Sequence, residues 1–317
     1  MPSRPYPAIA ILALNPSLDV SYEVPQLIPD QKARATLTRY DPGGNGINAG
    51  RTLKSLGVRA ECFCLVAGEI GLFLQRALEQ ELDSLRCVDV PGETRVNCTL
   101  IQAQPRVQYE VVAAGPTVPT AALEAVATGF LQAAGQGFGV LTGSLPPGVP
   151  DETYASLARR LRDNGARAVV DAQPAVLKPA LAARPFLIKP NRYELETLCR
   201  ARLPTRDRVL RMARDVQRAG INWVCVSLGG EGAVLVGEDE AYYAAAPPIT
   251  VRSTVGAGDA MLAGLVAGFA RAEEPAAALR LGVACGSATA EKAGTMLCTA
   301  DDVARLGAAI EVHQIHE

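Results

Sequence analysis

Histidine, lysine and aromatic residues are scarce in this chain of 317 residues. Both histidines, His313 and His316, stand at the C-terminal end, so a histidine base or a histidine-ligated zinc site in the core is excluded. Their i, i+3 spacing could hold a metal, although a frayed polar terminus accounts for it better. Aromatic residues make up 5% of the chain and lysines number five, so each lysine can be considered individually.

The chain also lacks CxxC pairs, long apolar runs and a strong net charge. Its eight cysteines are scattered, which is typical of small core residues kept reduced in the cytosol. No stretch of 18 apolar residues occurs, and the N-terminus does not have the pattern of a signal peptide. A net charge of -2 gives no general attraction to nucleic acid or to anionic membranes. We therefore expect a cytoplasmic globular protein without a nucleic-acid or membrane partner.

Apolar β-type runs alternate with segments of helical period through most of the chain. The expected strands are 8–14, 61–67, 138–142, 167–171, 185–189, 223–227 and 233–237. The expected helices are 45–57, 71–82, 121–134, 152–164, 191–199, 206–219, 257–271 and 275–291. This alternation predicts an α/β fold, a three-layer sandwich whose central sheet is mainly parallel. We expect residues 1–317 to form one domain.

Two segments break this rhythm, namely 17–42 and 93–113. Both alternate polar and apolar residues, as antiparallel strands exposed on one face do. We expect them to pair as one small β-sheet that projects from the main domain and serves as a lid.

Glycine and small polar residues cluster where strands end, which is where open α/β sheets bind ligands. The stretch "DPGGNGINAG" opens a helix with Gly43, Gly44 and Gly46 and places Asn48 on its first turn. A ligand could approach this backbone closely, but a glycine-rich helix start without a function fits equally well. The turn "GSLPPG" likewise either presents Ser144 to a ligand or is an ordinary surface turn.

Three further stretches could serve a nucleotide. In "KPNRYELE", Asn191 and Glu194 share a helix face and could organise Mg²⁺, or could simply cap the helix. The glycines of "SLGGEG" could surround phosphates, form a hairpin turn, or do both. In "STVGAGD", the N–H groups of Ala257, Gly258 and Asp259 would be unpaired at a helix start and form an anion site, with a carboxylate in reach to take a proton.

Together these motifs resemble the ribokinase-like (PfkB) family of sugar kinases. Residues 43–50 resemble its first signature and 253–264 its second, with "GSLPPG", "KPN" and "SLG" between them in order. The stretches "NPSLD", "TRVN" and "LIKPN" resemble the phosphosugar branch of this family. The resemblance implies an ATP- and Mg²⁺-dependent phosphotransferase with an alcohol acceptor, with a monovalent cation such as K⁺ near Ser253, Val255 and Gly294.

The resemblance also implies a role for individual residues. Asp259 would be the catalytic base, beside an anion hole formed by Gly256, Ala257 and Gly258. The sugar hydroxyls would be held by Asp19, Gly44 and Asn48, and the sugar phosphate by Lys32, Arg95 and Ser144. The nucleotide would contact Lys189, Asn191, Ser227, Gly229, Gly232, Thr254 and Ser287, and Mg²⁺ would be held by Asn191 and Glu194.

The expected acceptor is fructose-6-phosphate, with fructose-1-phosphate and tagatose-6-phosphate as alternatives. Asn45 and the stretch "GTMLCTADD" favour the first, whereas Glu110 stands where a basic residue is expected. A nucleoside kinase would have little use for Arg95 and Lys32, and a silent sugar- or nucleotide-binding regulator would be expected to have lost Asp259. We also expect a homodimer formed through the lids, on a face that carries Val20, Tyr22, Val24, Val96 and Leu100.

Overall fold

The computed structural model describes residues 6–315 and contains two sheets. The larger sheet has ten strands in the order β14-β13-β12-β11-β10-β9-β8-β1-β4-β5. Its strands are β1 (Ile9–Ala13), β4 (Glu61–Val66), β5 (Leu85–Asp89), β8 (Phe138–Thr142), β9 (Arg167–Asp171), β10 (Leu187–Ile188), β11 (Trp223–Ser227), β12 (Ala233–Val236), β13 (Ala241–Ala244) and β14 (Val312–Gln314). The seven neighbouring strands β11, β10, β9, β8, β1, β4 and β5 run parallel. Strands β12, β13 and β14 form an antiparallel edge.

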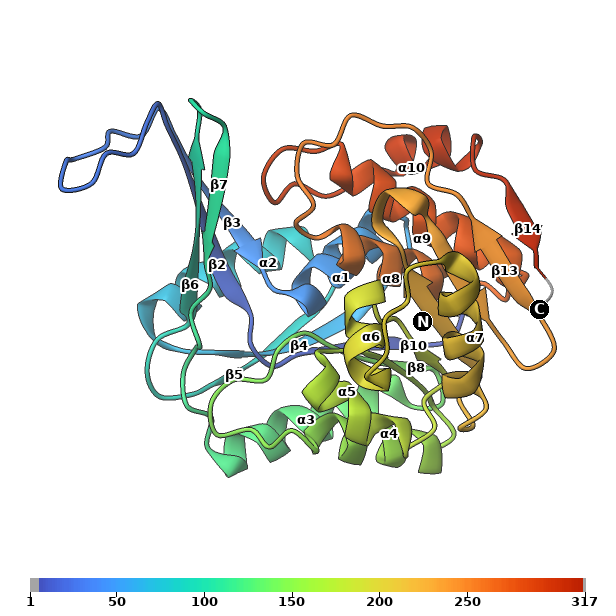
Figure 1. Ribbon diagram of the computed structural model, residues 1–317. Coiled ribbons are helices and arrows are strands. Elements are labelled where there is room, and N and C mark those ends of the chain that lie inside the picture. The colour runs from blue at the N-terminus through green and yellow to red at the C-terminus, as the bar shows by residue number, and fades with distance from the viewer. Residues whose placement is uncertain (1–5, 316–317) are drawn as a thin grey trace.

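Helices cover both faces of this sheet and complete three layers (Figure 1). One face packs against α3 (Thr120–Ala134), α4 (Thr153–Asp163), α5 (Pro174–Leu181), α6 (Arg192–Cys199) and α7 (Arg206–Gln217). The other face packs against α1 (Asn45–Ser55), α2 (Gly68–Glu81), α8 (Ala257–Ala270), α9 (Pro275–Ala290) and α10 (Ala300–Gly307). The central strands β1 and β8 are almost entirely apolar because both of their faces are buried.

Helix α8 is buried along nearly its whole length, which explains its small residues. A Cβ atom at Gly264 would lie only 2.8 Å from the Cα of Gly282 on α9, and one at Gly268 would lie 2.7 Å from the Cα of Ala278. Glycine therefore allows α8 and α9 to pack backbone against backbone. This close packing fixes the N-terminus of α8, where Asp259 is located.

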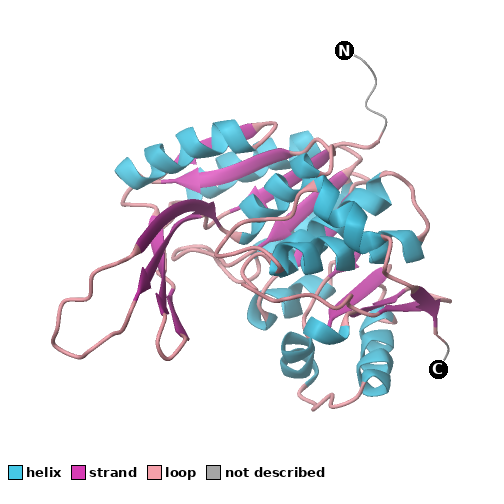
Figure 2. Cartoon of the chain, turned by 90° about the horizontal axis from the view of Figure 1, so that it is seen from above, coloured by secondary structure: helices cyan, strands magenta, loops and turns pink. Residues whose placement is uncertain are grey.

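The second sheet projects from the main body, as Figures 1 and 2 show. It contains β2 (Ser17–Val24), β3 (Leu37–Gly43), β6 (Arg95–Gln102) and β7 (Val107–Val111) in the order β3-β2-β6-β7. The predicted pairing of segments 17–42 and 93–113 is thus confirmed. One detail differs: β2 and β6, which belong to different segments, pair in parallel rather than antiparallel.

The predicted fold class is confirmed, and the eight predicted helices correspond to α1 to α4 and α6 to α9. Helices α5 and α10 and strands β5, β13 and β14 were not predicted. None of the helices between residues 6 and 315 combines the length and apolarity that crossing a bilayer requires. His313 lies on β14, while His316 is outside the described residues.

Candidate active site

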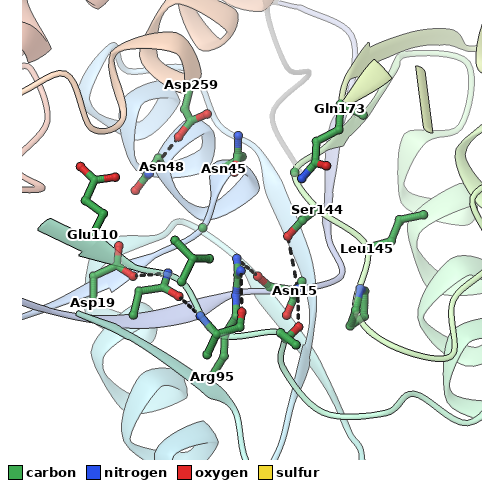
Figure 3. A pocket seen from close by; sticks show the side chains of 18 of the residues that line it. Asn15, Asp19, Asn45, Asn48, Arg95, Glu110, Ser144, Leu145, Gln173 and Asp259 are labelled. Carbon is green, nitrogen blue, oxygen red and sulfur yellow. Dashed lines mark hydrogen bonds between the residues drawn. The ribbon is translucent and has the colours of Figure 1, made fainter. Parts of the chain in front are cut away.

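A cavity of about 930 Å³ lies between the lid and the carboxyl ends of the parallel strands (Figure 3). Side chains from the lid, from α1 and from the loops after β1 and β8 converge on it. It is lined by the predicted residues Asp19, Gly44, Asn48, Arg95, Ser144, Glu194, Thr254, Gly256 and Asp259. The structure thus brings together residues that lie up to 240 positions apart in the sequence.

Asp259 is buried on the first turn of α8 and faces this cavity. The turn before it requires glycine, because Gly256 has φ 77° and caps the helix in the left-handed region. Nδ2 of Asn48 donates a hydrogen bond of 2.9 Å to Oδ2 of Asp259. Burial raises the pKa of Asp259 to about 6, although the hydrogen bond from Asn48 lowers it. The carboxylate is therefore a stronger base than an exposed aspartate.

Backbone donors lie beside this carboxylate. Among the described residues, no acceptor pairs with the N–H groups of Gly258 and Asp259, whereas the N–H of Ala257 donates to Thr254 O at 3.3 Å. The expectation of three unpaired donors was therefore wrong for Ala257, because the turn that starts α8 uses its N–H. Two free N–H groups at the positive end of a 14-residue helix still suit an anion.

A buried ion pair lies next to these donors. Nζ of Lys189 is 3.2 Å from Oδ2 of Asp171, at the carboxyl ends of the neighbouring strands β10 and β9. A Cβ atom at Gly258 would lie 3.5 Å from the same Nζ. Burial opposes the charge on Lys189, but Asp171, Asp259 and Glu194 outweigh it and raise the lysine pKa. Lys189 therefore stays cationic next to the anion site.

The lid contributes a second carboxylate. Asp19 accepts hydrogen bonds from Ser17 Oγ at 2.7 Å and from Asn97 Nδ2 at 2.9 Å. Burial raises the pKa of Asp19, and these two hydrogen bonds lower it. A carboxylate held by two donors keeps a fixed orientation, and its remaining lone pairs can accept hydrogen bonds from sugar hydroxyls.

Arg95 is the guanidinium of the cavity and begins the lid strand β6. Its Nη2 donates to Asn15 O at 2.7 Å and its Nη1 to Ala113 O at 3.3 Å, while its buried Nε has no partner. Within residues 6–315 no ion pair includes Arg95, and burial lowers its pKa. The nearby carboxylate of Asp19 opposes this shift but forms no direct ion pair with the guanidinium, which is therefore suited to bind an anionic ligand.

A second cavity of about 540 Å³ adjoins the first and shares Thr254 with it. Ser227, Gly229, Gly232 and Ser287 line it, together with Ala257 and Gly258. Gly229 to Glu231 form a single 3-10 turn between β11 and β12, so the predicted hairpin turn is present. A lining of apolar side chains and backbone polar groups suits a nucleotide base and ribose. The phosphates of such a nucleotide would reach the N-terminus of α8.

Asn191 and Glu194 form a capping box at the start of α6. Oδ1 of Asn191 accepts from the N–H of Glu194 at 2.8 Å, and Oε2 of Glu194 accepts from the N–H of Asn191 at 2.8 Å. The side-chain oxygens of Asn191 and Glu194 are also suitable ligands for Mg²⁺. Within the described part of the chain, no group of three or more His, Cys, Asp and Glu could hold a metal ion. A Mg²⁺ ion here would therefore be shared with the phosphates of a nucleotide.

Three of the residues predicted to bind sugar or nucleotide line neither cavity. Lys189 and Asn191 lie just behind the larger cavity, where they contact Asp171 and Glu194 of its lining, whereas Lys32 stands apart. Lys32 is exposed on the loop between β2 and β3 and does not line the cavity of its own chain. Conversely, the sequence analysis missed Asn15, Asn97 and Asp171, which line the cavity. Asp171 ends a buried apolar strand, and Asn15 closely follows one, so the rule that ligands bind at the carboxyl ends of strands could have identified both.

Comparison with known proteins identifies the family to which the chain belongs. Residues 13–302 match the model of the pfkB family carbohydrate kinases. This chain belongs to the pfkB family. The ATP-dependent 6-phosphofructokinase isozyme 2 of Escherichia coli is 33% identical over 300 residues, which are 94% of this chain and 97% of that protein. The 1-phosphofructokinase of Rhodobacter capsulatus is 37% identical over 264 residues, 81% of this chain and 82% of the relative.

A solved structure supports the same assignment. Phosphofructokinase-2 from Escherichia coli in complex with potassium superposes with a TM-score of 0.91 at 33% identity, covering 95% of this chain and 98% of that one. The predicted ribokinase-like fold and the predicted class of phosphosugar kinase are confirmed by these relatives. The PfkB-family chain is thus a phosphotransferase with an alcohol acceptor, and ATP is the expected phosphoryl donor of the family.

Proposed function

We propose that the protein transfers a phosphoryl group from Mg²⁺–ATP to the 1-hydroxyl of fructose-6-phosphate and so forms fructose-1,6-bisphosphate. The proposal rests mainly on the position of Asp259, a buried carboxylate whose pKa is raised to about 6 and which lies where the two cavities meet. In this proposal residues 1–317 form a single kinase domain. The sugar phosphate occupies the larger cavity, and the nucleotide occupies the smaller one.

The chemistry follows from the order of groups around Asp259. ATP supplies the phosphoryl group, and the acceptor hydroxyl lies within reach of the Asp259 carboxylate. Asp259 takes the hydroxyl proton as the oxygen forms its bond to the γ-phosphorus of ATP and the bond from that phosphorus to the leaving ADP breaks. The free N–H groups of Gly258 and Asp259 and the ammonium of Lys189 stabilise the charge on the transferring group. Glu194 and Asn191 would hold Mg²⁺ against the nucleotide phosphates.

The acceptor's phosphate would bind Arg95 and Ser144. Both side chains line the cavity, and Arg95 has donors left and no carboxylate partner among the described residues. The other charged residues of the lining are all acidic, namely Asp19, Glu110, Asp151, Asp171, Glu194 and Asp259. Carboxylates suit sugar hydroxyls but repel phosphate, so the phosphate would lie at the Arg95 end.

A homodimer would supply a further cation. On the lid face directed away from the cavity, Tyr40, Val96 and Tyr109 are 39–57% exposed. Val20 and Val24, expected on the same face, are buried within the chain and add nothing to the exposed surface. Pairing two lids would cover this apolar face. It would also allow Lys32 to reach the phosphosugar of the other subunit, since it does not reach its own.

A monovalent cation fits the turn before α8. The carbonyl oxygens of Val255 and Gly294 accept no backbone hydrogen bond in the described part of the chain, and carbonyl oxygens are the ligands that K⁺ prefers. A related phosphofructokinase-2 was solved in complex with potassium. Lys292 lies 2.6 Å from Asp302, so that carboxylate holds its ammonium. We propose that K⁺ binds this turn.

An acceptor screen with ADP detection tests the function. Fructose-6-phosphate, fructose-1-phosphate and tagatose-6-phosphate are compared at equal concentrations, with fructose and adenosine as acceptors without phosphate. We expect the highest kcat/KM with fructose-6-phosphate and a product phosphorylated at both ends by ³¹P NMR. A higher kcat/KM with fructose-1-phosphate would assign the alternative acceptor. Turnover of adenosine alone would overturn the proposal.

A further inference from the structure

Asn15 occupies the point where the main sheet, the lid and the β8 loop meet, and it had no role in the predicted site. It lies two residues after β1, whose parallel neighbour β8 leads into Ser144. Its backbone carbonyl accepts the 2.7 Å hydrogen bond from Arg95, and its side-chain Nδ2 donates to Ser144 Oγ at 3.2 Å. Asn15 thus links the two side chains that would bind the acceptor's phosphate (Figure 3).

The direction of the bond to Ser144 is fixed by a third group. Nδ2 of Asn15 also donates to Ala114 O at 3.0 Å, and a backbone carbonyl can only accept. The amide therefore turns its NH₂ group toward both Ala114 and Ser144. A flipped amide would place its oxygen against the Ala114 carbonyl. Ser144 Oγ must then be the acceptor in its bond with Asn15.

This direction determines what the Ser144 hydroxyl can offer a ligand. A hydroxyl has one proton, and here its oxygen already accepts from Asn15. Among residues 6–315, no protein acceptor takes the Ser144 proton. The hydroxyl thus keeps its proton free to donate at the cavity, which suits an oxygen of a phosphate.

The packing of Asn15 is consistent with a functional role. Its side chain is buried, and its Oδ1 has no hydrogen-bond partner among the described residues. A buried acceptor without a partner destabilises the folded state. A Cβ atom at position 115 would be 2.4 Å from this oxygen, so glycine is needed at Gly115 to leave room for the amide.

We infer that Asn15 is a positioning residue for the phosphate of the acceptor: it fixes Ser144 as a hydrogen-bond donor and Arg95 as the adjacent cation. The inference rests on the proposed function, in which Ser144 and Arg95 bind that phosphate. Asn15 lies in the larger cavity with the two side chains that it orients and does not line the nucleotide cavity. Its loss should therefore change KM for the phosphosugar, with little effect on kcat or on KM for ATP.

A double-mutant cycle tests the inference with fructose-6-phosphate and ATP. Ser144→Ala should raise KM for the phosphosugar about tenfold, the usual effect of losing a hydrogen bond to a charged group. Asn15→Ala should raise the same KM several-fold, but in the Ser144→Ala background its further effect should be less than about twofold. A melting curve of each variant shows whether it is folded.

The outcomes separate the inference from the proposed function. If Asn15→Ala raises KM equally with and without Ser144, or lowers kcat instead, Asn15 does not act through Ser144 and the inference fails alone. If Ser144→Ala leaves KM for the phosphosugar unchanged, the placement of the phosphate fails as well. Should Asn15→Ala not fold, Asn15→Asp fills the same space and, by accepting the Ser144 proton, should raise KM further.

Discussion

Asn48 on α1 and Asp259 on α8 are joined by a hydrogen bond of 2.9 Å, although 211 residues separate them in the chain. The bond connects the first glycine-rich signature to the second. Because Asn48 donates, it stabilises the ionised form of the carboxylate that acts as the base in our proposal. Asn48 therefore affects the pH at which the enzyme works.

The pH profile of kcat/KM should show this contribution. Burial raises the pKa of Asp259 to about 6, so activity should fall about tenfold per pH unit below that value as the base becomes protonated. Asn48→Ala removes a bond that lowers this pKa, so its acidic limb should move to higher pH. The acceptor's phosphate titrates in the same range, but equally for both enzymes, so only the shift between the two profiles is interpreted. Identical acidic limbs would exclude Asn48 from this role.

Arg95→Ala should raise KM for the phosphosugar far more than KM for ATP. A lost hydrogen bond to a charged group is worth about 1.5–3 kcal/mol, which corresponds to roughly ten- to hundredfold. Arg95→Lys, which keeps the charge but loses the forked geometry, should give an intermediate KM. Steady-state kinetics with each substrate varied in turn provide the measurement. An equal rise in both KM values would place Arg95 outside the phosphate site.

Glu194→Gln should raise the Mg²⁺ concentration required for half-maximal activity. Glutamine can still accept the hydrogen bond from the N–H of Asn191, so α6 keeps its capping box while the negative charge is lost. Glu196→Gln, a change two positions along the same helix, serves as the control. A Mg²⁺ titration at fixed ATP compares the variants with the wild type. An unchanged Mg²⁺ requirement in Glu194→Gln would remove Glu194 from the metal site.

Tyr40→Asp should convert the proposed dimer into monomers. Tyr40 is 57% exposed on the lid face that would pair, and a desolvated carboxylate there is costly. Phe73→Asp on α2 is the matched control, since Phe73 is 51% exposed but lies outside the lid. Light scattering at micromolar concentration gives the mass of each protein. A monomeric wild type, or a control that dissociates equally, would contradict the lid interface.

The sequence was informative wherever a short pattern determines a local structure. Glycine-rich helix starts and continuous apolar strands located α1, α8 and the central sheet within a few residues. Helix α5 was not predicted because it contains Pro179 in its interior, and an interior proline argues against a helix. Alternation in the lid gave the period of its strands but not their direction, so the parallel pairing of β2 with β6 could not be foreseen.

The site was predictable in part for the same reason. Asp259 and Asn48 belong to sequence motifs and could be predicted from them. Asp171 is part of the site because it pairs with Lys189. That pair forms only because β9 and β10 are neighbours in the sheet, which the sequence does not show. Asn15 gains its role from three groups that are distant in sequence. For Lys32, the sequence cannot show that its ammonium lies outside the cavity of its own chain.

The most direct test of the account is the turnover number of Asp259→Asn with saturating fructose-6-phosphate and ATP. An amide cannot accept the hydroxyl proton, so kcat should fall roughly a hundredfold or more, while ATP binding stays nearly intact. The folded state disfavours the charged form of Asp259, since its pKa is raised, so above about pH 6 the variant should melt no lower than the wild type. A folded variant with near-normal kcat would show that Asp259 is not the base and would contradict the account.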